Sequence, residues 1–121
     1  MNIVGNLKNG SVKIRNLKSE DGLHFSFNIN VRTQNLSFSY NFGEVVYFRM
    51  EDFLNENSTK LQDVNYMGNF LELTKDYFCI SINQNGAESN IKLDINQFED
   101  QEILTNFLIE LKAYYEVLRK K

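Results

Sequence analysis

The sequence contains no proline and no tryptophan, and it has only one cysteine and one histidine. The single cysteine, Cys79, excludes an intramolecular disulfide, and no Cys or His pair has the spacing of a zinc site. No apolar run reaches the length of a membrane span, and the first residues are not a basic segment followed by an apolar one. We therefore expect no signal peptide, no membrane association and a cytoplasmic location.

The basic excess that marks most nucleic-acid-binding proteins is also missing, because the formal net charge is −3. The basic residues lie mainly toward the two ends of the sequence, at Lys8, Lys13, Arg15, Lys18, Arg119, Lys120 and Lys121. A basic patch would require these ends to meet in space. We therefore expect no nucleic-acid partner, whereas a mildly acidic protein suits a basic protein partner by electrostatic complementarity.

The residues that are present are sufficient for one folded domain. The chain has 121 residues, of which 42% are hydrophobic and 13% aromatic, and no linker-like or low-complexity stretch interrupts it. We predict a single domain over residues 1–121 with its own core. Proline has GC-rich codons and the abundant asparagine has AT-rich ones, so we hypothesise an AT-rich bacterial or phage gene.

Alternation of apolar and polar residues predicts the strands. Six are expected, over residues 12–17, 23–31, 36–42, 70–73, 77–82 and 91–95. Turn residues at 19–22 predict a hairpin between the first two strands, and those at 84–86 predict one between the last two. Gly43 either ends the third strand or marks a β-bulge, and a short apolar run follows at 45–48.

Two helices are predicted from apolar residues at helical spacing. The first covers residues 49–57, with Glu51 and Asp52 in its first turn, where acids interact favourably with the helix dipole. The second, near the end of the chain, follows Asn96, which fits an N-cap with Glu99 as its reciprocal partner. Its apolar face comprises Ile103, Leu104, Phe107, Leu108, Leu111, Tyr114, Tyr115 and Leu118. The predicted fold is α+β: a largely antiparallel sheet of about six strands, a short middle helix, and a long C-terminal helix packed on one face.

The sequence shows no signature of catalysis. Cys79 stands between two apolar residues of a predicted strand, which favours a small buried side chain over a reactive thiol. His24 stands on the polar face of another predicted strand. We find no EF-hand loop, phosphate-binding glycine motif or nucleophile elbow. We therefore predict a protein that is not an enzyme, with no catalytic, metal-binding or cofactor-binding residues.

An acidic stretch is the first candidate for contact with a partner. It consists of Glu44, Glu51, Asp52 and Glu56, which together would suit a basic protein surface. The simpler interpretation is local, because Glu51 and Asp52 would stabilise a helix start and Lys60 would offset Glu56.

Two apolar features also allow more than one interpretation. Ile109, Ala113 and Val117 fall on the side of the long helix opposite its main apolar face, either as a minor contact surface or as ordinary exposed residues. An aromatic set either lines a pocket for an apolar ligand or fills the core, and its strand-like alternation favours the core. This set is Phe25, Phe27, Phe38, Tyr40 and Phe42.

The order of these elements resembles that of a known family. A hairpin is followed by a third strand that runs into a short helix, LSFSYNFGEVVYFRMEDFLNE, and then by three strands and a terminal helix, GNFLELTKDYFCISINQNGAESNIKLDINQFEDQEILTNFLIELKAYY. This arrangement, with its NFLEL strand and the strand-to-helix junction at IKLDIN, is similar to the WapI-like immunity proteins of wall-associated polymorphic toxins. The resemblance covers nearly the whole chain.

The resemblance implies a protein that binds the toxic C-terminal domain of a cognate effector inside the producing cell. Such toxin domains are often basic nucleases, which suits the acidic balance of this chain. Two alternatives remain open: a phage or bacterial inhibitor of a defence nuclease, and a small domain that binds an apolar ligand.

Overall fold

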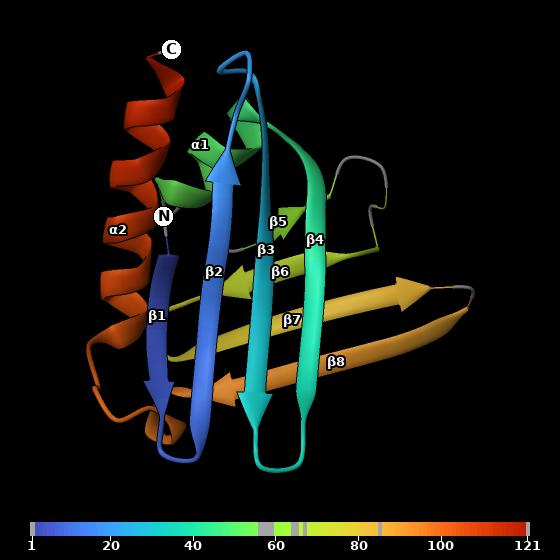
Figure 1. Ribbon diagram of the computed structural model, residues 1–121, viewed down its shortest axis with the longest axis vertical. Helices are drawn as coiled ribbons and strands as arrows, with labels where there is room; N and C mark the ends of the chain where they lie inside the picture. The colour runs from blue at the N-terminus through green and yellow to red at the C-terminus, as the bar shows by residue number, and fades with distance from the viewer. Residues whose placement is uncertain (1, 56–59, 64–65, 67, 85, 121) are drawn as a thin grey trace.

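Eight strands form two four-stranded antiparallel sheets in the computed structural model, which describes residues 2–55, 60–63, 66, 68–84 and 86–120. Sheet A has the order β1-β2-β3-β4 and comprises β1 (Asn2–Leu7), β2 (Gly10–Lys18), β3 (His24–Thr33) and β4 (Ser37–Val46). Sheet B has the order β5-β6-β7-β8 and comprises β5 (Lys60–Gln62), β6 (Phe70–Leu73), β7 (Tyr77–Gln84) and β8 (Ala87–Asp94). The strands of sheet B run behind sheet A and across the direction of its strands (Figure 1).

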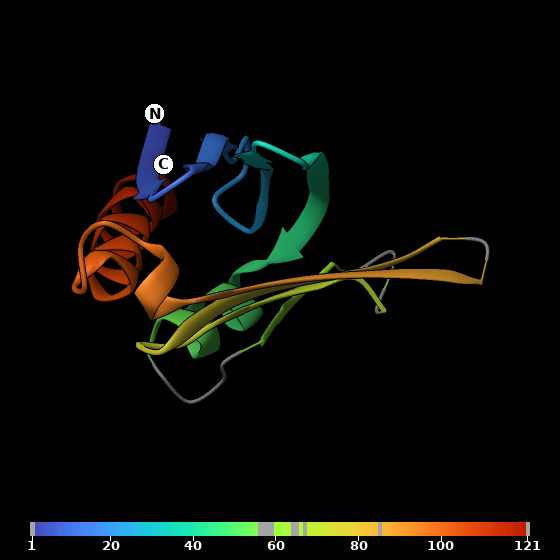
Figure 2. The same cartoon turned by 90° about the horizontal axis from the view of Figure 1, so that it is seen from below.

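Two α-helices complete the fold. Helix α1 (Tyr47–Leu54) follows β4 directly, and α2 (Ile103–Arg119) ends the chain. Figure 2 shows α2 at the side of the molecule, between the β1 edge of sheet A and the near end of sheet B. Its rings reach both sheets, because Phe107 lies 6.4 Å from Phe78 of β7 and Tyr115 lies 5.1 Å from Phe25 of β3, between ring centroids. None of the described helices is long and apolar enough to cross a membrane.

The α+β class is confirmed, but the prediction of about six strands in one sheet is wrong. Alternation identified six strands and missed β1, whose inward row is broken by Gly5, and β5, which has only three residues. Gly5 is required where it stands, because a Cβ atom there would lie 2.5 Å from Phe107 Cε2. Helix α2 therefore packs closely against the inward side of β1, at the edge of sheet A.

Two β-bulges set which side chains face inward in sheet A. In β2, Asn16 has a φ of 58° and the register shifts between Arg15 and Lys18, which turns Leu17 into the core. In β4, the register shifts opposite Phe25 to Phe27, where Gly43 lies. Of the two interpretations of Gly43, the bulge is confirmed.

Both helices begin at different residues from those predicted. Helix α1 begins at Tyr47, so Glu51 and Asp52 lie in its middle and not in its first turn. Asn96 does not cap α2 but lies in a short 3₁₀ turn, Ile95–Gln97, where the Gln97 side chain accepts a hydrogen bond from the Asp94 N–H over 2.8 Å. After this turn Phe98 takes an extended conformation and is fully buried, which delays α2 until Ile103.

The core lies between the sheets and against α2. Buried side chains from both sheets and both helices form one cluster. The predicted face of α2 is confirmed, with its buried members being Leu104, Phe107, Leu111, Tyr115 and Leu118.

Candidate functional site

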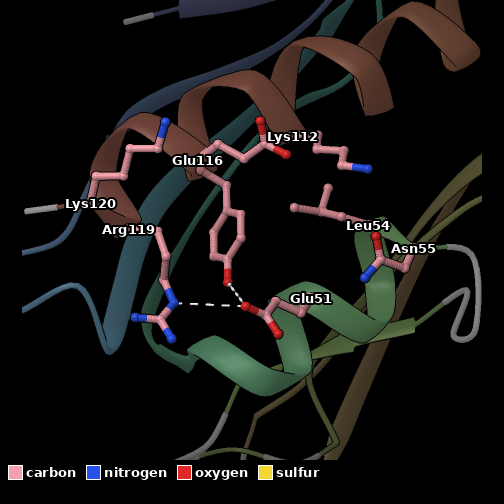
Figure 3. A pocket seen from close by; sticks show the side chains of 8 residues that line it. Glu51, Leu54, Asn55, Lys112, Glu116, Arg119 and Lys120 are labelled. Atoms are coloured by element: carbon pink, nitrogen blue, oxygen red, sulfur yellow. Dashed lines mark hydrogen bonds and ion pairs between the residues drawn. The ribbon is translucent and has the colours of Figure 1, made fainter.

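Glu51, one of the four acids predicted to contact a partner, lies in α1 and faces α2. The Tyr115 hydroxyl donates a hydrogen bond to Glu51 Oε1 over 2.6 Å, and Arg119 Nε lies 3.7 Å from the same oxygen. Figure 3 shows Glu51 and Arg119 directed toward each other across the space between the helices. Glu51 therefore ties the two helices together, and part of its charge is offset within the protein.

The other predicted acids lie in different places. Glu44 in β4 approaches His24, with 3.5 Å between Glu44 Oε1 and His24 Nε2. Asp52 is exposed on α1 and lines a small hollow with Lys60. Glu56 lies outside the described residues. The structure therefore does not gather the described acids into a single acidic surface.

A groove of about 520 Å³ opens between α1 and α2 (Figure 3). It is lined by Glu51, Leu54, Asn55, Lys112, Tyr115, Glu116, Arg119 and Lys120. The hydrogen bond between Glu51 and Tyr115 fixes its wall, whereas Lys112, Glu116 and Lys120 are exposed and extend from α2 at its rim. This α1–α2 groove combines a fixed wall with charged groups that are free to pair with a ligand.

Arg119 holds the end of this groove in place. Its guanidinium lies 4.3 Å from the ring centroid of Tyr47, and its Nη1 donates a hydrogen bond to the Gly22 carbonyl oxygen over 3.4 Å. These contacts join the end of α2 to the start of α1 and to the β2–β3 turn. Burial raises the pKa of Tyr115 to about 12, and the hydrogen bond to Glu51 acts in the same direction.

His24 is exposed, as predicted, but it is held between two carboxylates. Its Nδ1 lies 2.8 Å from Asp21 Oδ2, while its Nε2 faces Glu44. The hydrogen bond to Asp21 raises the pKa of His24, and the same bond, together with two backbone N–H donors, lowers the pKa of Asp21. Because the two carboxylates approach opposite ring nitrogens, this arrangement does not direct three ligands at one metal ion. In the described part of the chain no group of three or more His, Cys, Asp or Glu side chains is placed to hold a metal.

Cys79 is partly exposed, which corrects the prediction of a buried side chain. It lies on the outer face of sheet B, whereas its neighbours Phe78 and Ile80 are buried. Across the strands it stands in one row with Glu72 and Lys92. Burial and the Glu72 carboxylate raise the pKa of the Cys79 thiol, which opposes formation of a reactive thiolate.

One buried polar cluster has no counterpart in the sequence analysis. Asp63 is 2% exposed; the Tyr40 hydroxyl donates to its Oδ2 over 3.0 Å, and the Gly43 N–H donates to the same oxygen over 3.4 Å. Asn69 donates to the Tyr40 oxygen over 2.9 Å and accepts from the Asn83 N–H over 2.7 Å. Burial raises the pKa of Tyr40 to about 12. The cluster joins sheet A to sheet B beside the β4 bulge, so we assign it a structural role. Its members come from segments that are far apart in the sequence, so it can be recognised only once the two sheets are seen to lie close together.

The two apolar features are also placed by the structure. Phe25, Phe27 and Phe42 are buried, and the Phe27 and Phe42 rings stack with centroids 4.9 Å apart, so these rings belong to the core. Ile109 and Val117 on α2 are 62% and 59% exposed. By the helical period they continue from the rim of the α1–α2 groove around the outside of α2.

Comparison with known proteins finds no matching family model, no matching curated protein and no matching solved structure.

Proposed function

We propose that this protein is a non-enzymatic immunity protein that neutralises a cognate bacterial toxin domain by binding it directly. The observation that carries the proposal is the α1–α2 groove. Its wall is held by Glu51, Tyr115 and Arg119 before any partner arrives, so binding there costs little ordering of the protein. The element order that resembles WapI-like immunity proteins supplies the identity of the partner.

The surface around the groove has the composition of a protein interface. Exposed apolar side chains, Ile109 and Val117, adjoin the charged rim on the outer side of α2. Interfaces between proteins combine apolar contacts at the centre with a polar rim. A site for a small molecule does not need an apolar surface that extends beyond its pocket. A basic partner is favoured by the net charge of −3 and by two exposed acids, Glu116 at the groove and Asp52 on α1 outside it.

The position of Glu51 determines how this proposal is tested. Reversing the charge at Glu51 would break the contacts between α1 and α2, so a loss of binding would not separate interface from stability. Asp52 and Glu116 are exposed and suit the purpose. The matched control reverses Glu88 and Glu99, two exposed acids that lie on neither α1 nor α2, and makes the same change in net charge.

The experiment mixes the purified protein with the toxin domain encoded by the adjacent gene and measures toxin activity and affinity. We expect one complex, loss of toxin activity at equimolar protein, and at least tenfold weaker affinity in the Asp52→Lys/Glu116→Lys variant. The Glu88→Lys/Glu99→Lys control should bind as the unchanged protein does. A toxin that keeps full activity with this protein in excess would refute the function, whereas equal affinity in both variants would refute only the interface.

The main alternative is an inhibitor of a defence nuclease, from a phage or a bacterium. Such an inhibitor would bind its target directly through the same groove, so binding measurements on the groove do not separate the two functions. The genes that neighbour this one do. An adjacent toxin gene favours immunity, and adjacent phage genes favour the alternative. The apolar-ligand function has less support, because Phe25, Phe27 and Phe42 are buried and contact other core rings.

A further inference from the structure

No described segment covers the outer face of sheet A (Figures 1 and 2), and the central rows of this face carry no acidic side chain. Figures 1 and 2 both show sheet A on the outside of the molecule, with sheet B and α2 on its inner side. Strand register and burial place on this face Val4, Asn6, Ser11, Lys13, Arg15, Asn28, Asn30, Arg32, Ser37, Ser39 and Asn41, which we call the sheet A outer face. All but Val4 are polar or basic.

Three cations stand together in the middle of this face. Lys13 pairs with Asn30 across β2 and β3, Arg15 pairs with Asn28, and Arg32 lies opposite Ser11. Lys13 and Arg15 are neighbours along β2, and Lys13 and Arg32 are diagonal neighbours across the two strands, so their Cβ atoms are about 7–8 Å apart. No ion pair is found for any of these three cations among the described residues.

Acids limit the face at one end only. Asp21 and Glu44 lie beside His24 and contact its ring nitrogens, in a hollow that Lys18 also lines. These carboxylates are engaged locally and do not reach the central rows. The net charge of −3 thus conceals a segregated surface, with +3 on the sheet A outer face and −6 on the rest of the chain (−3 − 3 = −6).

The composition of this face distinguishes among anionic partners. The centres of protein interfaces are enriched in aromatic side chains and depleted in lysine and serine, whereas this face has no aromatic side chain and one apolar residue, Val4. Protein–nucleic acid interfaces are more polar and more positively charged than protein–protein interfaces. Single strands are held largely by stacking of bases on aromatic rings, which this face lacks. The residues of this face suit the phosphate backbone of a duplex, to which Lys, Arg, Asn and Ser all donate hydrogen bonds.

We propose that the sheet A outer face binds the backbone of a nucleic-acid duplex, with Lys13, Arg15 and Arg32 contacting phosphates. This inference differs from the expectation drawn from net charge. It is independent of the toxin-neutralising function, because its test needs no toxin. Three phosphate contacts give a slope of about −2.7 for log affinity against log salt concentration. Affinity should therefore fall about 40-fold between 50 and 200 mM salt.

The test measures fluorescence anisotropy of labelled duplex DNA and duplex RNA of about 20 base pairs across this range of salt. In Lys13→Gln/Arg15→Gln the slope should drop to about −0.9, with affinity at least tenfold weaker at 50 mM salt. The matched control, Lys112→Gln/Lys120→Gln, removes the same charge from the rim of the α1–α2 groove and should bind as the unchanged protein does. Melting temperatures verify that each variant is folded, and Arg32→Gln on the neighbouring strand repeats the test if the double variant unfolds.

Three results would overturn the proposal. The first is no measurable binding of either duplex at 50 mM salt. The second is an equal loss in the control pair, which would mean that general charge and not this face governs the affinity. The third is equally tight binding of poly-glutamate with the same dependence on Lys13 and Arg15, which would assign the face to an acidic polypeptide.

Discussion

Replacing Tyr115 with phenylalanine tests whether the contact between α1 and α2 is formed as described. The change removes the hydroxyl that donates to Glu51 Oε1 over 2.6 Å and leaves the buried ring in place. A hydrogen bond to a charged group contributes about 1.5–3 kcal/mol to stability. Because the Glu51 side chain is 42% exposed, water replaces part of the lost donor, and we expect a cost of about 1–1.5 kcal/mol. For a chain of this length the melting temperature should fall by about 3–5 °C.

The same variant has a distinctive dependence on pH. The folded-state pKa of Tyr115 is about 12 and its ordinary value is 10.0, so folding favours the protonated hydroxyl. The resulting contribution to the free energy of unfolding is complete below pH 10 and is lost as the pH rises from 10 to 12. Two pKa units correspond to at most about 2.7 kcal/mol. The unchanged protein, which is more stable at neutral pH, should therefore become less stable than Tyr115→Phe above about pH 11.

Urea unfolding followed by circular dichroism measures both effects. Tyr114→Phe removes a hydroxyl from the same helix and should change the free energy of unfolding by no more than about 0.5 kcal/mol. A double-mutant cycle with Glu51→Gln should give a coupling energy of about 1 kcal/mol between Tyr115 and Glu51. A coupling below about 0.3 kcal/mol, or parallel pH curves for the unchanged protein and Tyr115→Phe, would refute the reasoning.

Two further predictions concern β1 and the hollow at His24. Gly5→Ala should lower the free energy of unfolding by about 1–3 kcal/mol, measured by thermal or urea unfolding, because the new methyl group overlaps the Phe107 ring. The control Gly43→Ala has open space around it and should cost much less, so equal effects would contradict the close packing of α2 on β1. NMR titration should give His24 a pKa above 6.5, and this pKa should fall in Asp21→Asn. Any stabilisation of the fold by this contact is present below pH 6.5 and is lost as the pH rises through the raised pKa. A His24 pKa that Asp21→Asn does not change would contradict the contact.

Local patterns were enough to predict most elements of the fold. The alternation at 23–31 and the apolar face of α2 identified buried side chains correctly, because each depends on a repeat within one segment. The division into two sheets was not predictable in this way. Strand pairing depends on contacts between distant segments, and β1 and β5 have patterns too weak or too short to be seen alone.

The start of α2 shows how tertiary packing overrides a local signal. Asn96 and Glu99 have the spacing of a capping pair, yet the buried ring of Phe98 pulls this segment into an extended conformation. The nearby hydrogen bond between Asp94 and Gln97 then closes a single 3₁₀ turn. A cap in sequence is a weak preference of about 1 kcal/mol, whereas burial of a phenylalanine contributes about 1.5–3 kcal/mol.

The candidate site was only partly predictable for a related reason. Glu51 was identified as a notable acid, but its partners Tyr115 and Arg119 are more than sixty residues away in sequence and meet it only because α2 returns past α1. Net charge is a weak guide for a different reason, since a sum over the chain discards position. Alternation in β2 sends Val12 and Ile14 inward and Lys13 and Arg15 outward, and pairing with β3 adds Arg32 to the same face. The sequence thus contained the basic row, but only strand register shows that no acid lies beside it, and this is why a chain of negative net charge can present a cationic surface to a polyanion.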